Sequence, residues 1–184
     1  SRGMKAIGIV ELNSIARGFV AADAMLKTAP VGLHAAKPVC PGKYVIMVHG
    51  SVAEVQAAVQ AGVDAGAEFV VDHLVIARVH DDVWPAITGT LMPPPTDALG
   101  VIETYSIAST VMAADAAVKA AAVELLEVRL ALGLAGKAFT TLTGEVGAVR
   151  AAVEAGAQAA AAGGMLVETA VIPAPARDLT LLSL

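Results

Sequence analysis

The chain has 184 residues, of which 57% are hydrophobic but only 3% are aromatic, so alanine, valine and leucine supply most of its apolar mass. A formal charge of −5 leaves no broad basic surface to hold a nucleic-acid backbone. The single cysteine excludes an internal disulfide framework and a zinc site built from several cysteines of one chain. A soluble intracellular protein without a nucleic-acid partner is therefore expected.

The mean hydropathy of +0.71 raises the question of a membrane span. The longest uncharged run, Val83 to Thr96, has fourteen residues and contains four prolines, whereas a spanning helix needs about 20 apolar residues. The opening Ser1-Arg2-Gly3 before Met4 is typical of a cloning remnant rather than of a secretory signal. We therefore expect no membrane partner, and we expect the excess apolar surface to lie in a core and in subunit contacts.

The chain repeats itself once. At an offset of 92 residues, the stretch that starts at Ala6 (AIGIVE) meets the stretch that starts at Ala98 (ALGVIE), and at an offset of 94 Gly42-Lys43 meets Gly136-Lys137. This period exceeds the 20 to 50 residues of solenoid repeats, so it indicates a duplicated domain. We expect a first domain over residues 4–87, a proline-rich linker over 88–97 and a second domain over 98–182.

The first half predicts a strand, a helix, two strands, a helix and a final strand. Valine and isoleucine predict a strand over Ala6–Leu12, and Ser14 is positioned to cap a helix that Pro30 ends. Along that helix, apolar side chains recur at helical spacing at Ile15, Phe19, Ala22, Met25 and Leu26. Strands are then predicted over Val31–Val39 and Tyr44–Val48, a capping box at Ser51 and Glu54 begins the second helix, and a last strand is predicted over Phe69–Val79.

The second half predicts the same order of elements. The expected strands are Ala98–Thr104, Leu125–Leu132, Ala138–Leu142 and Leu166–Ile172, and the expected helices are Ser106–Ala121 and Glu145–Ala162. The order β-α-β-β-α-β in each half is that of ferredoxin-like folds. The fold class is therefore α+β, with two tandem ferredoxin-like domains.

Cys40 lies at the tip of a predicted turn, before Pro41 and Gly42. One interpretation is a small apolar side chain tucked under the turn. The other needs three subunits to meet at this loop, because three thiolates would then form a ligand set for an iron–sulfur cluster or another soft metal. The second half has Leu134, Ala135 and Gly136 at the matching place and no cysteine there.

The remaining polar residues do not form an enzyme constellation. The four histidines, at positions 34, 49, 73 and 80, have no metal-ligand spacing, so we interpret them as surface or hydrogen-bonded residues. The recurring Glu11 and Glu103 are interpreted as structural rather than as acid and base. Ser14 and Ser106 lack a Gly-x-Ser-x-Gly elbow and are interpreted as helix caps. We therefore expect no enzymatic activity.

Four stretches of the chain resemble the bacterial microcompartment shell domain. They are AIGIVE from Ala6, ADAMLK from Ala22, the Gly42-Lys43 pair and GSVAEV from Gly50, and the resemblance covers nearly all of Met4 to Ile172. It implies a tandem-domain shell protein that forms a homotrimer mimicking a hexamer. Such pseudo-hexamers tile, edge to edge with other shell proteins, into a protein shell in the bacterial cytoplasm.

The segment from Val39 to Lys43 is similar to the pore loop of the propanediol-utilisation type of tandem shell protein. That resemblance implies one [4Fe–4S] cluster per trimer, bound by Cys40 of three subunits, for electron or cluster transfer across the shell. The pore loops would be formed by Pro41, Gly42, Leu134, Ala135 and Gly136. The alternative within the family is a tile with a plain central pore for small metabolites.

The resemblance also assigns residues to the tile edge. Lys27 and Lys119 match the family's edge lysine, and Arg78 and His80 match its Ile-Pro-Arg-Pro-His segment. The second half lacks the arginine and histidine, so alternate edges are expected to differ. Encapsulated redox enzymes are further candidate partners. The alternative from another class is a duplicated ferredoxin-like regulatory domain that binds a small ligand between its halves and never forms sheets.

Overall fold

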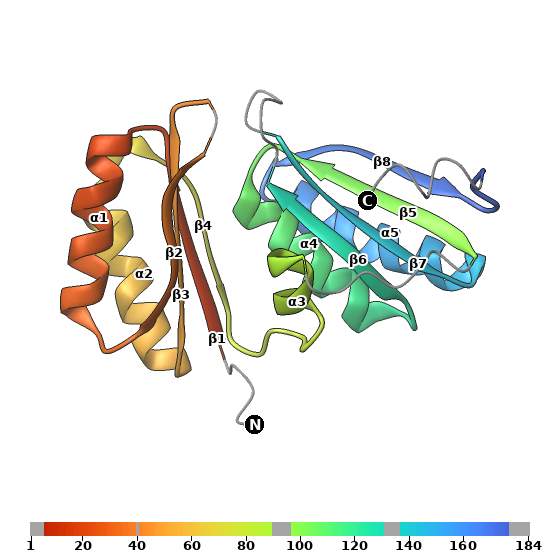
Figure 1. Cartoon of the computed structure of the whole chain (residues 1–184), viewed down its shortest axis with the longest axis horizontal. Helices are drawn as coiled ribbons and strands as arrows, with labels where there is room; N and C mark the ends of the chain where they lie inside the picture. Colours follow the sequence, from red (N-terminus) through yellow and green to blue (C-terminus); the bar gives the residue numbers. More distant parts are fainter. Residues whose placement is uncertain (1–5, 40, 90–96, 131–136, 177–184) are drawn as a thin grey trace. The chain divides into compact units, whose positions relative to one another are not determined.

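The structure is a computed structural model that describes residues 6–39, 41–89, 97–130 and 137–176. The described chain divides into two compact units, the first containing β1 to β4 and the second containing α3 to β8. In each unit two long helices cover one face of a four-stranded sheet (Figure 1). The elements in chain order are β1 (Ala6–Leu12), α1 (Ile15–Thr28), β2 (Gly32–Val39), β3 (Lys43–Gly50), α2 (Val52–Gly66), η1 (Ala67–Phe69), β4 (Val70–Ile76), α3 (Val83–Thr88), β5 (Ala98–Thr104), α4 (Ile107–Ala120), β6 (Glu124–Leu130), β7 (Ala138–Gly144), α5 (Val146–Ala162) and β8 (Leu166–Ile172).

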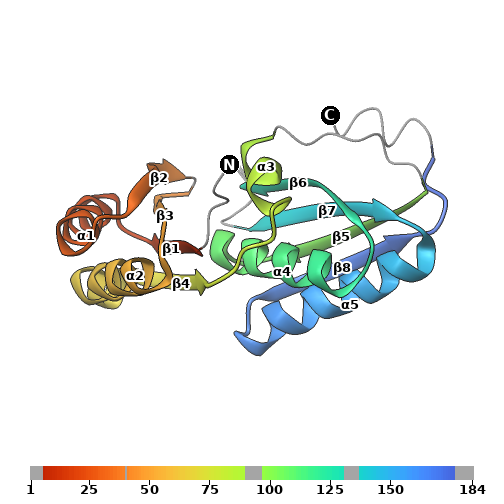
Figure 2. The same cartoon turned by 90° about the horizontal axis from the view of Figure 1, so that it is seen from below.

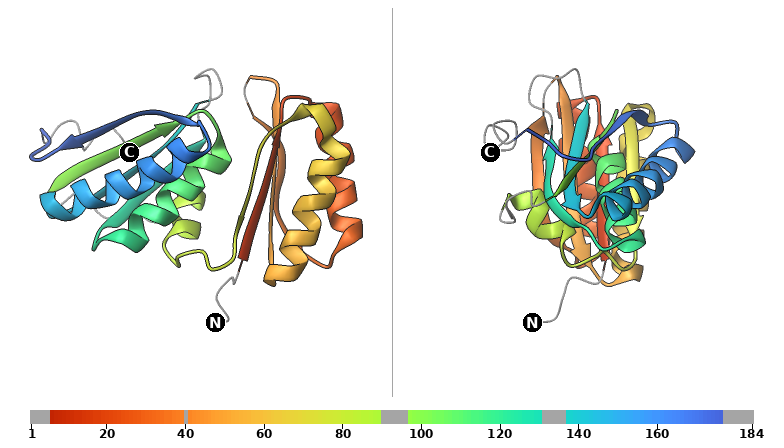
Figure 3. Two further views of the ribbon diagram at one scale, coloured as in Figure 1. Left: turned by 180° about the vertical axis from the view of Figure 1, so that it is seen from behind. Right: turned by 90° about the vertical axis from the view of Figure 1, so that its right-hand side faces the viewer.

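The two sheets have the same topology. Their strand orders are β2-β3-β1-β4 and β6-β7-β5-β8, and all neighbouring strands are antiparallel. Figure 3 shows α1 and α2 side by side on one face of the first sheet. The predicted β-α-β-β-α-β order of each half is confirmed, and with it the α+β fold class.

The predicted helix starts are confirmed by their hydrogen bonds. The Ser14 side chain accepts a hydrogen bond from the Arg17 backbone N–H at 3.2 Å, and a capping box joins Ser51 and Glu54. Both side chains satisfy backbone donors that the first turn of a helix leaves without a partner. The last predicted strand of the first half was too long, because β4 ends at Ile76 rather than at Val79.

The short helix α3 was not predicted. Proline is ordinarily a helix breaker, but Pro85 is the third residue of α3, where no N–H is needed for an intrahelical bond. Gly89 ends the helix in the left-handed conformation, with a φ of 73°. None of the described helices combines the length and the apolar character needed to cross a membrane.

Helix α1 buries only two, Ala22 and Met25, of the five apolar residues that recur at helical spacing. Gly18, Ala21, Ala22 and Met25 are buried, whereas Ile15, Phe19 and Leu26 are exposed. The small residues let α1 lie close to the sheet: a Cβ on Gly18 would come within 2.4 Å of the Tyr44 ring. The large apolar residues Ile15, Phe19 and Leu26 therefore lie on an exposed side of α1.

Recurring glycines mark where helices lie close to their neighbours in both units. A Cβ on Gly8 would lie 2.6 Å from Val59 of α2, and one on Gly100 would lie 2.7 Å from Val153 of α5. These distances are shorter than any normal carbon–carbon contact. The duplicated Gly8 and Gly100 are therefore explained by the close approach of a helix to the central strand.

A second glycine pair gives a matched prediction. A Cβ on Gly156 of α5 would lie 2.7 Å from the backbone oxygen of Ala113, whereas one on Gly62 of α2 would meet the Met25 side chain. The Ala113 backbone cannot move aside as the flexible Met25 side chain can. We therefore expect Gly156→Ala to destabilise the protein by about 2 kcal/mol. Gly62→Ala is expected to cost less, because the flexible Met25 side chain can move aside, while the gain in helix propensity of about 1 kcal/mol is common to both variants. Thermal unfolding of both variants measures the difference, and equal losses would contradict the close helix packing.

Candidate functional site

The turn between β2 and β3 carries the predicted pore residues of the first unit. Val39 and Lys43 pair across its base, and Pro41 and Gly42 are exposed. Gly42 has a φ of 67°, a conformation that favours glycine, and among the described residues, its chain neighbours aside, no atom lies within 4 Å of an added Cβ. Cys40 lies outside the described residues.

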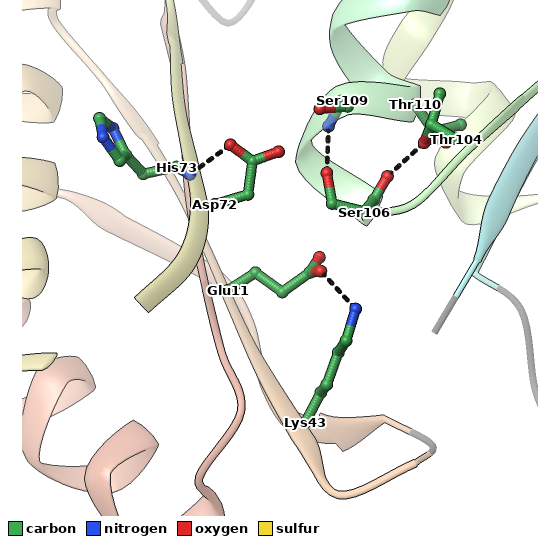
Figure 4. A network of polar contacts seen from close by, with 8 residues as sticks. All are labelled: Glu11, Lys43, Asp72, His73, Thr104, Ser106, Ser109 and Thr110. Carbon is green, nitrogen blue, oxygen red and sulfur yellow. Dashed lines mark hydrogen bonds and ion pairs between the residues drawn. The ribbon is translucent and has the colours of Figure 1, made fainter. Parts of the chain in front are cut away.

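The base of the turn is fixed by a buried ion pair. The Lys43 ammonium lies 3.1 Å from Oε2 of Glu11, whose side chain is fully buried on β1 (Figure 4). The pair joins an interior strand to the first residue after the turn. The interpretation of Glu11 as a structural residue is supported by this contact, which spans 32 residues of sequence.

The matching loop of the second unit differs. Its predicted pore residues Leu134, Ala135 and Gly136 lie outside the described residues. Glu103 on β5 and Lys137, which directly follows the loop, correspond to Glu11 and Lys43, yet among the described residues no ion pair joins them. The duplication has therefore diverged at both the tip and the base of the loop.

The two predicted edge lysines occupy the same helical position but have different surroundings. Lys27 lies in the last turn of α1 and its ammonium is 2.7 Å from Oδ2 of Asp23, with both side chains exposed. Lys119 of α4 makes the same contact with Asp115 at 2.7 Å. Asp115 is buried, and its other oxygen accepts a hydrogen bond from the His80 backbone N–H at 2.8 Å. Lys119 is thus held by an anchored carboxylate, and Lys27 is not.

Arg78 and His80 follow β4 on the way to α3. Arg78 is exposed, and Nδ1 of His80 accepts a hydrogen bond from the Asp82 N–H at 3.1 Å. No role was predicted for Asp23 or Asp115 from the sequence. Their spacing of four residues before a lysine was the available signal, since such pairs are neighbours on a helix surface.

The serine at the start of α4 is a cap, as predicted. Ser106 Oγ accepts a hydrogen bond from the Ser109 N–H at 3.0 Å, and its carbonyl accepts one from the Thr104 hydroxyl (Figure 4). The hydroxyls of Thr104 and Thr110 lie 2.6 Å apart and are buried. These contacts use the hydroxyl groups in local structure, which supports the interpretation of Ser106 as a structural residue rather than a nucleophile.

The described residues contain no group of three or more histidine, cysteine, aspartate or glutamate side chains that could hold a metal ion. A metal site made from the described part of one chain is thus not supported.

The pKa of His34 is lowered from its ordinary value. The main cause is burial, which disfavours the charged imidazole, and His49 and Lys37 lower it further by repelling that charge.

An open groove of about 460 Å³ lies between α5 and β8 of the second unit. Its polar side chains include Arg150, Glu154 and Gln158, all exposed on α5. Sites for small molecules usually enclose their ligand and direct a few polar groups at it. The groove is open to solvent and does not enclose a ligand. Figure 2 shows α5 and β8 along the same border of the second unit.

Comparisons with known proteins agree with the fold and the duplication. The BMC domain family matches residues 6–79 and 98–175. The bacterial microcompartment shell protein PduT of Citrobacter freundii is 43% identical over 171 residues, which cover 93% of each chain. The crystal structure of a microcompartments protein from Desulfitobacterium hafniense DCB is 50% identical, with a TM-score of 0.84 over 96% of this chain and 98% of that one.

A fused permuted hexameric shell protein of the RMM microcompartment shares the fold at 23% identity, with a TM-score of 0.64 over 85% of this chain and 83% of that one. The family match spans both units, and the similarity to PduT extends over nearly the whole chain. The chain therefore belongs to the BMC-domain family and is a tandem-domain, PduT-like shell protein of a bacterial microcompartment.

Proposed function

We propose that three copies of the chain form a pseudo-hexameric tile in which Cys40 of each copy binds one shared [4Fe–4S] cluster. The observation that carries this proposal is the β2–β3 turn. Its exposed Pro41 and Gly42 directly follow the only cysteine of the chain, and Lys43 and Glu11 fix its base. A cysteine beside such an anchored, exposed turn is suited to a site shared between copies.

The donor set agrees with a shared site. One chain offers a single thiolate, which is too few for a cluster of four irons. Three copies around an axis would offer three soft ligands and leave the fourth iron to a ligand other than a protein thiolate. When bound, the cluster would supply one-electron chemistry at the pore, for electron or cluster transfer across the shell.

The second candidate is a tile with a plain pore. Gly42 leaves open space at the turn, and small residues at Ala135 and Gly136 in the second loop would leave a passage for small metabolites. In that tile Cys40 would line the pore without binding metal. Under either candidate the role is structural or conducting rather than catalytic.

The proposed partners follow from the shell family. The tile would lie in the shell of a microcompartment in the bacterial cytoplasm, edge to edge with other shell proteins. Encapsulated redox enzymes would exchange electrons with the cluster. The different surroundings of Lys27 and Lys119 support edges that alternate around the pseudo-hexamer.

The edge proposal gives a matched pair of variants. We expect Lys27→Ala to reduce the assembly of tiles into sheets more than Lys119→Ala does. The exposed Asp23–Lys27 pair is worth only a few tenths of a kcal/mol, about 0.3 to 0.5, so the Lys27 ammonium readily exchanges it for a neighbouring tile. Negative-stain electron microscopy of purified protein measures the sheets. Equal losses, or a larger loss for Lys119→Ala, would contradict this difference between the edges.

Native mass spectrometry of anaerobically purified protein tests the tile and the cluster together. A trimer whose mass includes about four irons and four sulfides is the expected result. A trimer without iron after reconstitution would favour the plain pore, and a monomer would overturn the tile itself.

A further inference from the structure

The first unit leaves four large apolar side chains exposed along one border. Ile15, Phe19 and Leu26 are 40% to 62% exposed on α1, and Leu33 is 46% exposed on β2. The three α1 residues form one stripe, because their spacings of four and seven residues place them on the same side of a helix. Leu33 pairs with the core residue Val48, so it lies on the helix-covered face of the edge strand β2. We call these four residues the α1–β2 edge patch.

The duplicated positions in the second unit are buried. An offset of 92 residues leads from the patch to four counterparts on α4 and β6, each exposed by 8% or less: Ile107, Val111, Val118 and Leu125. The helix α3 packs against both α4 and β6 in that unit. The α1–β2 edge patch is thus exposed in the first unit, whereas α3 covers the matching surface of the second unit.

The segment after β4, which contains α3, is held on the second unit by specific contacts. Val83 and Ala86 of α3 are buried, and the His80 N–H donates to the buried carboxylate of Asp115 on α4. The counterpart of Asp115 in the first unit is Asp23, whose carboxylate is exposed. The first unit therefore repeats the apolar surface that binds this segment in the second unit.

The chain repeats the segment itself after β8. Ile76 and Ile172 occupy the same place in their sheets, opposite Ile7 and Leu99, which sets an offset of 96 residues. At that offset Leu179 and Leu182 match the two buried residues of α3, Val83 and Ala86. Asp178 matches Asp82 at the start of α3, and Ala176 matches His80.

We propose that residues 177–184 of one copy dock on the α1–β2 edge patch of a neighbouring copy, as α3 docks on the second unit. Leu179 and Leu182 would cover the patch. The occupant is a neighbouring copy because α3 follows the first unit and covers the unit that comes next. In a closed ring, the unit that comes after the second one is the first unit of another chain. The inference rests on the proposed trimeric tile.

Disulfide trapping tests the docking. In a Cys40→Ser background, Leu33→Cys combined with Leu182→Cys is expected to give linked dimers and trimers on non-reducing gels after mild oxidation. The matched control combines Leu182→Cys with Val20→Cys, because Val20 is similarly exposed on α1 but lies on a different side of the helix from the stripe. The control is expected to remain largely unlinked.

The pattern of disulfide links shows which chain supplies the segment that covers the α1–β2 edge patch. A link within one chain, seen as a faster-migrating monomer, would overturn docking on a neighbour. Unlinked protein that is trimeric by native mass spectrometry would overturn the inference and leave the tile intact. Protein that is both monomeric and unlinked would overturn the inference together with the trimer.

A second pair of variants does not depend on added cysteines. Leu179→Ser with Leu182→Ser is expected to weaken trimer association by about tenfold or more, because two docked apolar side chains are lost. Leu184→Ser is the control, since its α3 counterpart Thr88 is exposed. Analytical ultracentrifugation at several concentrations measures the association, and equal behaviour of the two variants would overturn the proposal.

Discussion

Replacing Cys40 by serine is expected to remove all cluster iron from the protein while leaving the trimer assembled. Serine keeps the size of the side chain but does not supply the soft thiolate that iron–sulfur clusters prefer. Because one change in the chain alters all three ligands of a shared site at once, the expected effect is complete loss rather than partial loss. Anaerobic iron and sulfide analysis, with visible absorption spectra, measures it.

The matched control for Cys40→Ser is Pro41→Ala, which changes the exposed neighbour and keeps the thiol. We expect this control to retain about four irons per trimer. Equal iron in wild type and Cys40→Ser would place the metal elsewhere and contradict the proposed site. Colourless wild-type protein after anaerobic purification and reconstitution would instead favour the plain pore.

Replacing Lys43 by methionine is expected to destabilise the first unit by about 3 kcal/mol. The Glu11 carboxylate is fully buried and lies 3.1 Å from the Lys43 ammonium. Without that ammonium the carboxylate either remains charged in a poorly solvated place or takes up a proton, and both cost free energy. Urea unfolding followed by circular dichroism measures the loss.

Two further variants separate the ion pair from general effects of the substitution. Lys137→Met is the control, because this counterpart has no ion pair with Glu103 among the described residues, and it is expected to change stability little. Adding Glu11→Gln to Lys43→Met is expected to recover part of the loss, since a neutral amide is less costly to bury than a charge. A Lys43→Met loss no larger than that of Lys137→Met would show that the pair does not anchor the turn.

The predicted elements were most accurate where one local signal decided the structure. The strands Ala6–Leu12, Ala98–Thr104 and Leu166–Ile172 have the predicted bounds, because each is rich in valine and isoleucine or threonine, which favour extended chain. Ser14, Ser51 and Ser106 begin helices as predicted, since capping depends only on residues three positions apart. These signals act within a few residues and can be read without the fold.

The candidate site was predictable only in part. The position of Cys40 before Pro41 and Gly42 indicated the turn that joins β2 and β3. The anchoring contacts were not predictable, because Lys43 meets Glu11 across 32 residues and the His80 N–H meets Asp115 across 35. No spacing rule links residues so far apart in sequence.

By itself the sequence determined the duplication, the order of elements in each half and the family, because each depends on patterns repeated along the chain. Only the tertiary structure decided which apolar residues are covered. Phe19 and Val111 have the same place in their helices, yet the first is exposed and the second is buried. Burial depends on what packs against a residue from elsewhere in the chain, and α3 packs against α4, the helix that carries Val111.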